Sequence, residues 1–552
     1  MPAVPLVLEL ELNTPLITSP PQDPLSAVRA RNRTHLSDLI EGLRRAAKDP
    51  KVAGLIAQCD GGTQPPAVVQ EIRDAVAGFR RSGKPAVAWA RSFGELGPGT
   101  TGYYLATAFD EIWLQPSGDV GLTGYSARAV FLREALDRAG LQPDLSQRHE
   151  YKNAADMFVR SQFSDAHREA LTRIVESTGE QVFDAVAAAR GLSTDRLRNI
   201  VDGGPLSATD ARDAGLVDHV GYRDEVYTAM ARRLGGRMRL RYVGRYNHAA
   251  GKAQILRLPV HRSRGNVAVI YGKGPIAVGR SSASPFSEGS IGADTLSANL
   301  RAAAADKNVK AIVFRVDSPG GSYVASDTIR REILLARRTK PVIASMGSVA
   351  GSGGYFVTMC ADVVVASPAT ITGSIGVVGG KVVPKRLLER LGIRVGSVST
   401  GAQAGMFAAD EPFTQEQWEI LNGWMDRVYD DFTAKVAEDR GLSREAVDDV
   451  ARGRIWTGAD ARDRGLVDEL GGLSTAIRIA RDRGRLPDRD DLSDVQGYPK
   501  VPFLERLRPA ESSQSPAAAS SSLNPWGTLA HLATALGLPA AGPLSMPFVP
   551  SV

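Results

Sequence analysis

Residues 341–358 read PVIASMGSVAGSGGYFVT, an apolar run followed by a turn of glycines and serines and then by aromatic residues. Short apolar runs bounded by turn residues are typical of buried strands, and glycines allow backbone angles and close approaches that side chains forbid. The stretch therefore predicts a buried strand, a tight turn at Ser352 and a helix, and not a membrane span. Two interpretations of Ser352 stay open at this point. It caps the helix, or it is a nucleophile beside bare amides that hold an oxyanion.

The chain contains two copies of one sequence pattern. GYYLATAFDEIWLQPSGDVGLTG at 102–124 matches GYFVTMCADVVVASPATITGSIG at 354–376, and DARDAGLVD at 210–218 matches DARDRGLVD at 460–468. Repeated blocks in the same order indicate an internal duplication. Each copy alternates apolar strands with helical segments, which predicts tandem α/β domains with largely parallel sheets.

The repeats and the changes in composition divide the chain into four segments. We expect an N-terminal domain at 1–243, a connection at 244–265, a C-terminal domain at 266–487 and a low-complexity, flexible tail at 488–552. Within the tail, WGTLAHLATALGL at 526–538 could instead lie on a membrane surface as a helix.

Composition excludes several classes of function. The 552 residues include 67 basic and 61 acidic side chains mixed along the chain, so neither a nucleic-acid arm nor a polybasic membrane anchor is expected. Two cysteines, Cys59 and Cys360, are too few for a disulfide framework or a zinc site. The first 17 residues lack the basic start and long apolar core of a signal peptide, and their alternation predicts a strand. No transmembrane segment is expected either.

The two copies differ where chemistry could have been divided between them. Ser352 aligns with Thr100, so the first copy lacks the serine turn. In the next block, EYKNAADMF at 150–158 aligns with STGAQAGMF, and Lys152 falls opposite Gly401. One copy therefore carries a serine and the other a lysine.

A nucleophilic serine needs a positioned base. The second half has no histidine between His261 and His531, so a base must come from elsewhere. His149 and His167 of the first half are candidates. Lys152 is another, provided that burial lowers its pKa from about 10.4 by roughly three units.

Four motifs occur together in this chain: EYKNAADMF at 150–158, DSPGGS at 317–322, MGSVAGSGGYF at 346–356 and TGSIG at 372–376. In combination they resemble the signal peptide peptidase A family, also called protease IV, in its long tandem-domain form. The resemblance covers roughly residues 5–485. It implies a crotonase-like or Clp protease-like fold in both halves.

The resemblance also implies a catalytic site. Ser352 would be the nucleophile, Lys152 the general base and Ser374 the residue that orients the lysine amine. The amides of Gly321 and Gly353 would form the oxyanion hole. No metal and no cofactor would take part.

The function implied by the resemblance is that of a serine endopeptidase that degrades short apolar peptides, such as cleaved signal peptides. It further implies a homotetramer, association with the cell membrane and, without a spanning segment, peripheral membrane contact. A cytoplasmic location is the alternative. A crotonase-like acyl-CoA enzyme and a non-catalytic assembly scaffold are the alternative functions, and no nucleic-acid partner is expected.

Overall fold

The computed structural model describes most of the two repeats. The described residues are 4–20, 33–60, 64–249, 265–283, 289–487 and 495–499, together with the backbone at 520–521 and 544–545. Most of the predicted connection and most of the predicted tail, including the segment at 526–538, lie outside the described residues.

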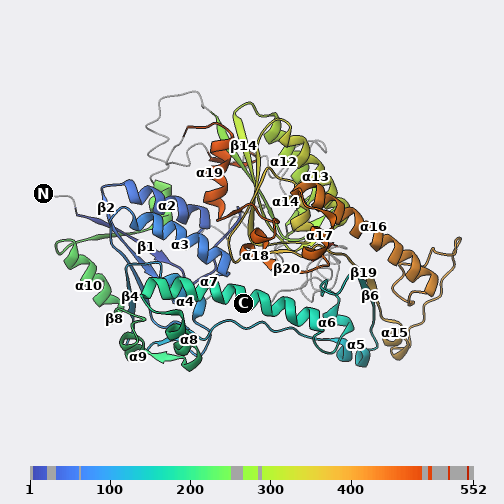
Figure 1. The fold of residues 1–552 in the computed structure, drawn as a ribbon, viewed down its shortest axis with the longest axis horizontal. Coiled ribbons are helices and arrows are strands. Elements are labelled where there is room, and N and C mark those ends of the chain that lie inside the picture. Colours follow the sequence, from blue (N-terminus) through green and yellow to red (C-terminus); the bar gives the residue numbers. More distant parts are fainter. Residues whose placement is uncertain are drawn as a thin grey trace.

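The first half forms a parallel sheet in the order β8-β4-β3-β2-β1-β9 (Figure 1). Its strands are β1 (Leu6–Glu11), β2 (Val52–Gln58), β3 (Ala86–Ala90), β4 (Glu111–Leu114), β8 (His219–Val220) and β9 (Arg239–Tyr242). Its longer helices are α2 (Leu36–Lys48), α3 (Pro66–Arg80), α4 (Thr100–Ala106), α7 (Asp165–Arg190), α8 (Thr194–Gly203), α9 (Ala208–Asp213) and α10 (Arg223–Arg233). The central strands β2 and β3 are apolar except for Gln58 at the end of β2, because both faces of the sheet are covered. The predicted N-terminal strand is confirmed as β1.

The second half forms a sheet in the order β20-β18-β16-β14-β10-β22, with β17 and β21 branching from β16. Its strands are β10 (Asn266–Lys273), β14 (Val309–Ser318), β16 (Val342–Gly351), β17 (Val363–Ala366), β18 (Ile371–Gly373), β20 (Ile455–Thr457), β21 (Glu469–Leu470) and β22 (Val495–Tyr498). Its longer helices are α12 (Ala293–Ala305), α13 (Tyr323–Arg337), α14 (Gly353–Thr358), α16 (Gln415–Arg440), α17 (Arg444–Val450), α18 (Gly458–Asp463) and α19 (Leu473–Arg483). The strand, turn and helix predicted at 341–358 are confirmed as β16, Ser352 and α14.

The duplication is visible in three dimensions. The path β8-β4-β3-β2-β1-β9 has its counterpart in β21-β17-β16-β14-β10-β22. Each half contains an ion pair at the matched position. Arg190 donates a hydrogen bond to Asp218 at 2.9 Å, and Arg440 donates to Asp468 at the equivalent place. The prediction of tandem α/β domains with largely parallel sheets is confirmed.

The described residues of the predicted tail, 488–552, pair with strands of the second half. Val495–Tyr498 forms β22, which pairs in parallel with β10 as β9 pairs with β1. Two short pairs add backbone from further along: β23 (Ser520–Ser521) with β12 (Ser282–Ala283), and β24 (Leu544–Ser545) with β15 (Gly320–Gly321). These strands are two to four residues long, so their pairing and not their sequence pattern defines them.

Shorter elements connect the two halves. β6 (Gln142–Gln147) of the first half pairs antiparallel with β19 (Val378–Val383) of the second. The remaining short elements are β5 (Asp119–Val120), β7 (Leu206–Ser207), β11 (Ile276–Ala277), β13 (Ile291–Gly292), α5 (Arg133–Ala139), α6 (Asp156–Val159) and α15 (Lys385–Arg390).

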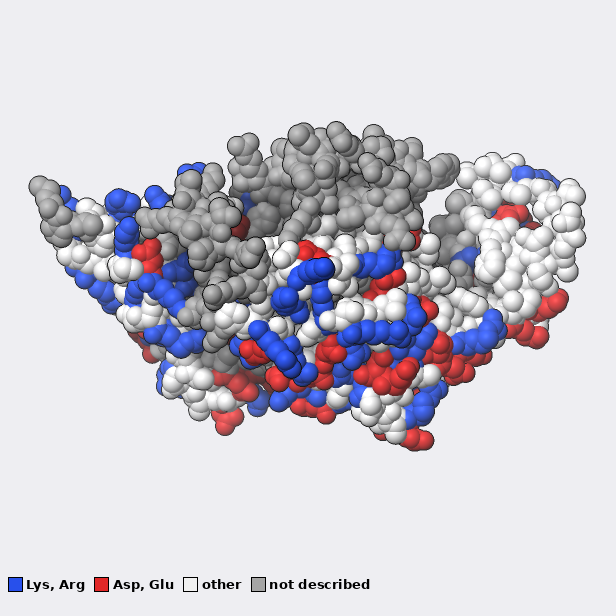
Figure 2. Space-filling model, turned by 90° about the horizontal axis from the view of Figure 1, so that it is seen from above, with Lys and Arg blue, Asp and Glu red and all other residues white. Residues whose placement is uncertain are grey.

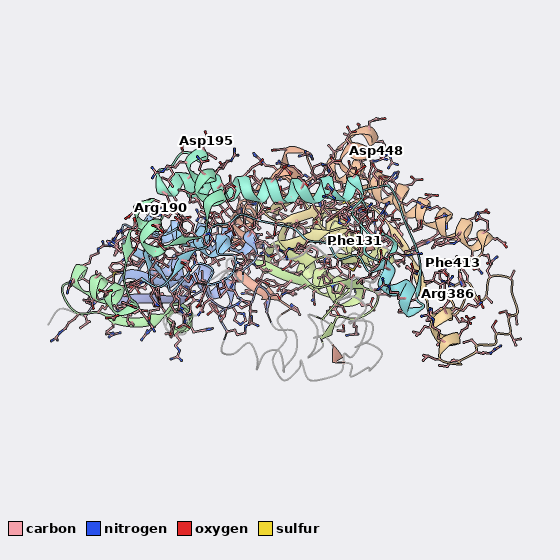
Figure 3. All side chains as sticks on the ribbon, turned by 90° about the horizontal axis from the view of Figure 1, so that it is seen from below. Phe131, Arg190, Asp195, Arg386, Phe413 and Asp448 are labelled. Atoms are coloured by element: carbon pink, nitrogen blue, oxygen red, sulfur yellow. The ribbon has the colours of Figure 1, made fainter. Side chains whose placement is uncertain are left out.

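Helix α7 lies along both halves of the molecule (Figures 1 and 3). Ser164 caps its first turn by accepting a hydrogen bond from the His167 amide, and the helix ends at Gly191 in a left-handed conformation. Its middle contacts the second half, where the Ser177 hydroxyl lies 2.8 Å from that of Thr457. This helix therefore fixes the lysine-bearing half against the serine-bearing half.

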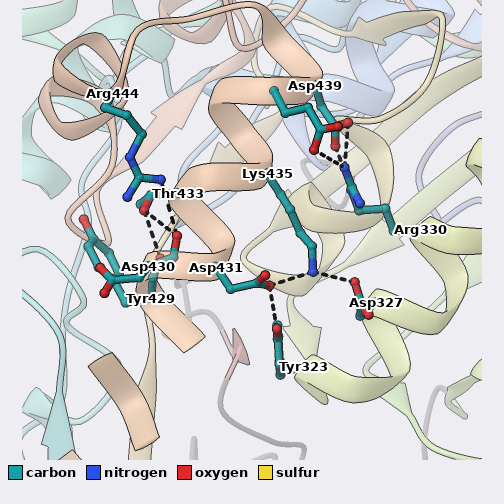
Figure 4. A network of polar contacts seen from close by, with 11 residues as sticks. Tyr323, Asp327, Arg330, Tyr429, Asp430, Asp431, Thr433, Lys435, Asp439 and Arg444 are labelled. Atoms are coloured by element: carbon teal, nitrogen blue, oxygen red, sulfur yellow. Dashed lines mark hydrogen bonds and ion pairs between the residues drawn. The ribbon is translucent and has the colours of Figure 1, made fainter. Parts of the chain in front are cut away.

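A polar network holds α16 against α13 (Figure 4). Lys435 donates to Asp327 and to Asp431 at 2.7 Å each, and Arg330 forms a two-bond pair with Asp439 at 2.8 Å. Helix α13 begins two residues after Gly321, so this network also supports the strand β15.

The surface carries charges of both signs. Lys and Arg side chains alternate with Asp and Glu on the face shown in Figure 2. Across the described ranges, every helix is too short or too polar to cross a bilayer.

A buried ion pair joins the two halves of the molecule. Glu71 on α3 contacts Arg315 on β14, and the side chains are 3% and 5% exposed. Arg315 also donates to the Ser345 hydroxyl and the Met346 carbonyl at 2.9 Å, and Glu71 accepts the Leu473 amide. Both terminal nitrogens of Arg315 and both carboxylate oxygens of Glu71 therefore have partners, as burial of charge requires.

Replacing Arg315 should destabilise the protein strongly. Arg315→Met leaves the Glu71 carboxylate buried without a cation, and we expect a loss of about 3–5 kcal/mol. Urea unfolding followed by circular dichroism measures the loss. The matched control is Arg478→Met, since Arg478 pairs with Asp482 at the exposed surface. Equal midpoints for the two variants would show that the buried pair does not hold the halves together.

Candidate active site

Ser352 lies in the turn between β16 and α14. Its backbone has φ +54° and ψ −113°, a conformation that costs a non-glycine residue of order 1–3 kcal/mol. Its amide donates to the Gly373 carbonyl at 2.8 Å, which fixes the turn. Gly354 is required next to it, because an added Cβ would lie 2.6 Å from the Ser318 carbonyl oxygen. The glycines thus allow the strained turn that presents the hydroxyl.

Lys152 approaches Ser352 from the first half. It follows β6 in a turn that leads into α6, and its side chain is fully buried. The amine nitrogen lies 2.8 Å from the Ser352 hydroxyl oxygen, within hydrogen-bond distance. It lies 3.0 Å from the Ser374 hydroxyl oxygen and 3.1 Å from the Ser374 carbonyl oxygen. Three oxygens therefore surround the amine.

The environment of Lys152 favours the neutral amine. Burial lowers its pKa well below the usual value of 10.5, because the charged form is deprived of water. Its three hydrogen-bond partners are two serine hydroxyls and a carbonyl, with no carboxylate among them. A neutral amine bonded to a hydroxyl can accept the hydroxyl proton.

Ser374 follows β18 in a second left-handed turn. Its φ is +52°, and its amide donates to the Arg454 carbonyl at 2.7 Å. The turn directs both the hydroxyl and the carbonyl oxygen to the Lys152 amine. Ser374 therefore supplies two of the three oxygens around the Lys152 amine.

Gly321 and Gly353 are adjacent in space. Gly353 is the first residue of α14, and a Cβ added to it would lie 3.1 Å from the Gly321 amide nitrogen. Gly321 has φ +150° and packs against the Ile276 backbone, where an added Cβ would meet the carbonyl oxygen at 2.2 Å. Only glycine fits at this position.

The two histidines considered from the sequence lie in other surroundings. The His149 ring contacts Tyr429, and burial lowers the pKa of His149. The His167 ring nitrogen lies 3.3 Å from Asp156. Within the described residues, neither histidine hydrogen-bonds to Ser352 or to Lys152.

The counterparts of the serine and the lysine in the opposite repeats have different surroundings. The Thr100 hydroxyl accepts the Gly124 amide and donates to the Gly124 carbonyl, both at 3.1 Å. Gly401 is exposed, and a Cβ added there would meet nothing within 4 Å. The side chains therefore meet at one junction per chain.

Two glycines that the sequence did not single out line the lysine. A Cβ on Gly453 would lie 2.4 Å from the Lys152 backbone nitrogen, and one on Gly376 would lie 3.0 Å from the Lys152 Cδ. Gly376 belongs to the TGSIG motif, so its proximity to Ser374 was a usable signal. Gly453 lies in the turn before β20, and nothing local in its sequence connects it with Lys152.

Comparison with known proteins identifies the class of this protein as a peptidase. The model of the peptidase family S49 matches residues 78–236 and 335–486, one segment in each half. The chain belongs to peptidase family S49.

Curated relatives agree with this assignment. The chain is 33% identical over 480 residues to "Serine protease SPPA, chloroplastic" of Arabidopsis thaliana, covering 86% of this chain and 68% of the relative. It is 33% identical over 468 residues to "Protease 4" of Salmonella typhi, covering 82% and 72%. The predicted resemblance to the signal peptide peptidase A family in its long form is confirmed. Among solved structures, a ClpP1 N165D mutant from Listeria monocytogenes matches with 17% identity and a TM-score of 0.25, over 38% of this chain and 94% of that one.

The buried Lys152 should lower the free energy of unfolding by an amount that depends on pH. The unfolded chain holds the lysine proton up to about pH 10.5, whereas the folded chain releases it at lower pH. Lys152→Met should therefore raise the free energy of unfolding. The gain should shrink by about 1.4 kcal/mol per pH unit as the pH rises toward 10.5, and it should level off below the folded pKa.

Urea unfolding between pH 6 and pH 10 measures this gain. The exposed Lys307→Met is the matched control and should show no such pH dependence. A gain that is constant with pH, or a loss, would mean that Lys152 is charged in the folded protein.

Proposed function

We propose that this protein is a serine endopeptidase with a Ser/Lys dyad, acting on extended apolar peptides such as cleaved signal peptides. The observation that carries the proposal is the 2.8 Å hydrogen bond between the Lys152 amine and the Ser352 hydroxyl, at a fully buried lysine. The apolar substrate class follows from the resemblance to the signal peptide peptidase A family.

The reaction begins with transfer of the hydroxyl proton to Lys152. The Ser352 oxygen attacks the scissile carbonyl carbon as its proton passes to the lysine nitrogen. The resulting ammonium gives that proton to the departing amine, and an acyl ester remains on Ser352. Lys152 then takes a proton from water as the water oxygen attacks the ester, and it returns that proton to the Ser352 oxygen as the ester bond breaks and the second product leaves. Ser374 holds the amine in line throughout.

The oxyanion is assigned to the amides of Gly321 and Gly353. Both glycines lie beside Ser352, and Gly353 follows it directly in the chain. Backbone amides that need no reorganisation stabilise a developing oxyanion by several kcal/mol.

The strand β15 supports a peptide as the substrate. The chain's own β24 pairs with it antiparallel, placing Leu544 opposite Gly321 and Ser545 opposite Gly320. An extended peptide can therefore add to this edge through backbone hydrogen bonds, as peptide-binding proteins commonly allow. Gly321 would then contact the substrate backbone on the strand that also supplies the oxyanion hole.

Removing either member of the dyad should abolish proteolysis. We expect Ser352→Ala and Lys152→Ala to lower kcat/KM for an apolar fluorogenic peptide by about a thousandfold or more, because the nucleophile and base act together. A fluorophosphonate probe should label Ser352 in the wild type and fail to label Lys152→Ala.

His149→Ala tests the alternative base, and it should retain the turnover that Lys152→Ala loses. If His149→Ala abolished turnover and Lys152→Ala preserved it, a histidine base would replace the lysine. Binding of a CoA thioester with no proteolysis would instead favour the acyl-CoA enzyme.

We also propose that copies of this chain assemble head to tail. Helix α15 and the following residues form an arm, residues 385–409, that projects from the second half (Figures 1 and 3). Residues 395–409 carry no charge, and Val395 and Val398 are 57% and 102% exposed. In the first half the equivalent segment is α5 and β6, which docks on β19 of the second half.

The internal pairing gives the register of the contact between copies. Residues 394–399 correspond to β6, and residues 126–131 correspond to β19, in the aligned repeats. Within a single chain, residues 126–131 and residues 394–399 belong to no helix or strand. Each arm would therefore pair antiparallel with residues 126–131 of the next copy, and such heterologous contacts close into rings. Four copies are expected from the resemblance.

Charges on the arm should prevent this assembly. Val395→Asp combined with Val398→Asp should give monomers in sedimentation velocity, because the carboxylates would be buried at the contact. Leu240→Asp, on the edge strand β9, is the control and should leave the wild-type assembly intact. A wild type that sediments as a monomer at micromolar concentration would overturn the proposal.

A further inference from the structure

The residues Arg452, Gly453 and Arg454 form a turn between α17 and β20 that contacts the lysine loop, residues 149–153. These three residues, called the clamp below, belong to the half that carries the serine. The lysine loop belongs to the other half. We propose that the clamp positions Lys152 for proton transfer, with Gly453 as the principal positioning residue. The proposal rests on the proposed role of Lys152 as general base.

Gly453 packs directly on the backbone of Lys152. It has φ +87°, and an added Cβ would lie 2.4 Å from both the Lys152 nitrogen and Cβ. The neighbours of that Cβ are backbone atoms and the first side-chain atom, which cannot rotate away. The absence of a side chain at Gly453 therefore fixes how closely Lys152 approaches the second half.

Arg452 holds the residues that precede the lysine. Its guanidinium forms two hydrogen bonds of 2.9 Å with the Glu150 carboxylate, and its carbonyl accepts the Tyr151 amide at 3.2 Å. Arg452 is itself held at φ +56°, where its amide donates to the Tyr429 hydroxyl. A two-bond pair fixes direction as well as distance.

Arg454 closes the other side of the loop. Its guanidinium lies 4.9 Å from the centre of the Tyr151 ring and forms an ion pair with Glu169 at 2.7 Å. The Tyr151 hydroxyl donates to the same Glu169 at 2.8 Å. The residue directly before Lys152 is thus held at its ring, its hydroxyl and its backbone.

The clamp also holds Ser374. The Ser374 amide donates to the Arg454 carbonyl at 2.7 Å, and the Gly453 amide donates to the Ile375 carbonyl at 2.7 Å. One turn therefore sets both the backbone of Lys152 and the serine that receives its amine. A shift of the clamp would move the amine relative to Ser352, and displacements of about 1 Å can cost about a hundredfold in rate.

The first experiment adds one methyl group. In the full chain, Gly453→Ala should lower kcat for an apolar fluorogenic peptide by about a hundredfold with little change in KM, since the base moves and the β15 edge does not. The acid limb of its rate profile should shift to higher pH, because a lysine pushed out of its dry site regains water. A purely structural role would not move that limb.

Gly441→Ala is the matched control. Gly441 has φ +64° at the end of α16, and a Cβ there meets nothing within 4 Å. It carries the backbone penalty of a left-handed alanine without contact to Lys152, so kcat and the pH profile should be those of the wild type. Wild-type kinetics in Gly453→Ala would overturn the proposal. If Gly453→Ala does not fold, the charge reversal below decides.

The second experiment reverses the Glu150–Arg452 pair. Glu150→Arg and Arg452→Glu should each lower kcat about fivefold, as expected for a partly exposed pair worth about 1 kcal/mol. The double variant should regain most of the loss. Arg478→Glu, at an exposed pair elsewhere, should have no effect. Additive losses in the double variant would show that the pair does not position the loop.

Failure of this proposal can be told from failure of the proposed function. If the dyad is wrong, either the wild type shows no peptide cleavage and no labelling of Ser352 by a fluorophosphonate, or Lys152→Ala keeps the wild-type rate. If only the clamp is wrong, the wild type is active and labelled, and Gly453→Ala matches it in kcat and pH profile.

Discussion

The geometry of the site depends on one contact, the hydrogen bond between a desolvated lysine amine and a serine hydroxyl from the opposite half of the chain. A lysine is neutral near pH 7 only if water is kept from it, and no carboxylate accepts from this amine. Such burial requires protein atoms around the whole amine to exclude water. Both halves supply these atoms, so the halves must be docked rigidly before the contact can exist.

Rigid docking explains the polar character of the junction. The Glu71–Arg315 pair is buried and makes further hydrogen bonds to Ser345, Met346 and Leu473, and α7 adds the Ser177–Thr457 contact. Apolar packing alone is tolerant of small sliding, whereas charged and hydroxyl groups lose their partners when they slide. A junction of paired polar groups therefore holds the amine at a defined distance from the hydroxyl, and two strained turns complete the geometry. Ser352 and Ser374 both have φ above +50°, which non-glycine residues rarely adopt.

Part of this site could be predicted from the sequence and part could not. Ser352 was marked by the glycines around it, and Lys152 by its mismatch with Gly401 between repeats, because both signals are local or follow from the duplication. Their distance from each other, and the contact of Gly453 with Lys152, depend on segments that meet only in the folded chain. The same holds for β22, whose four residues form a strand because β10 offers an edge. Turn chemistry and periodicity identify elements, and long-range packing decides which residues touch.

The duplication explains why one chain forms one such junction. In the first half the Thr100 hydroxyl donates to the Gly124 carbonyl and accepts from the Gly124 amide. Its hydrogen bonds are thus made to backbone groups and not to an amine. In the second half the segment equivalent to the lysine loop ends in an exposed turn at Gly401. A duplicated domain that still had to satisfy its own active site could not give up either group. The contact combines the serine of one copy with the lysine of the other, so the matched positions, Thr100 and Gly401, take no part in it.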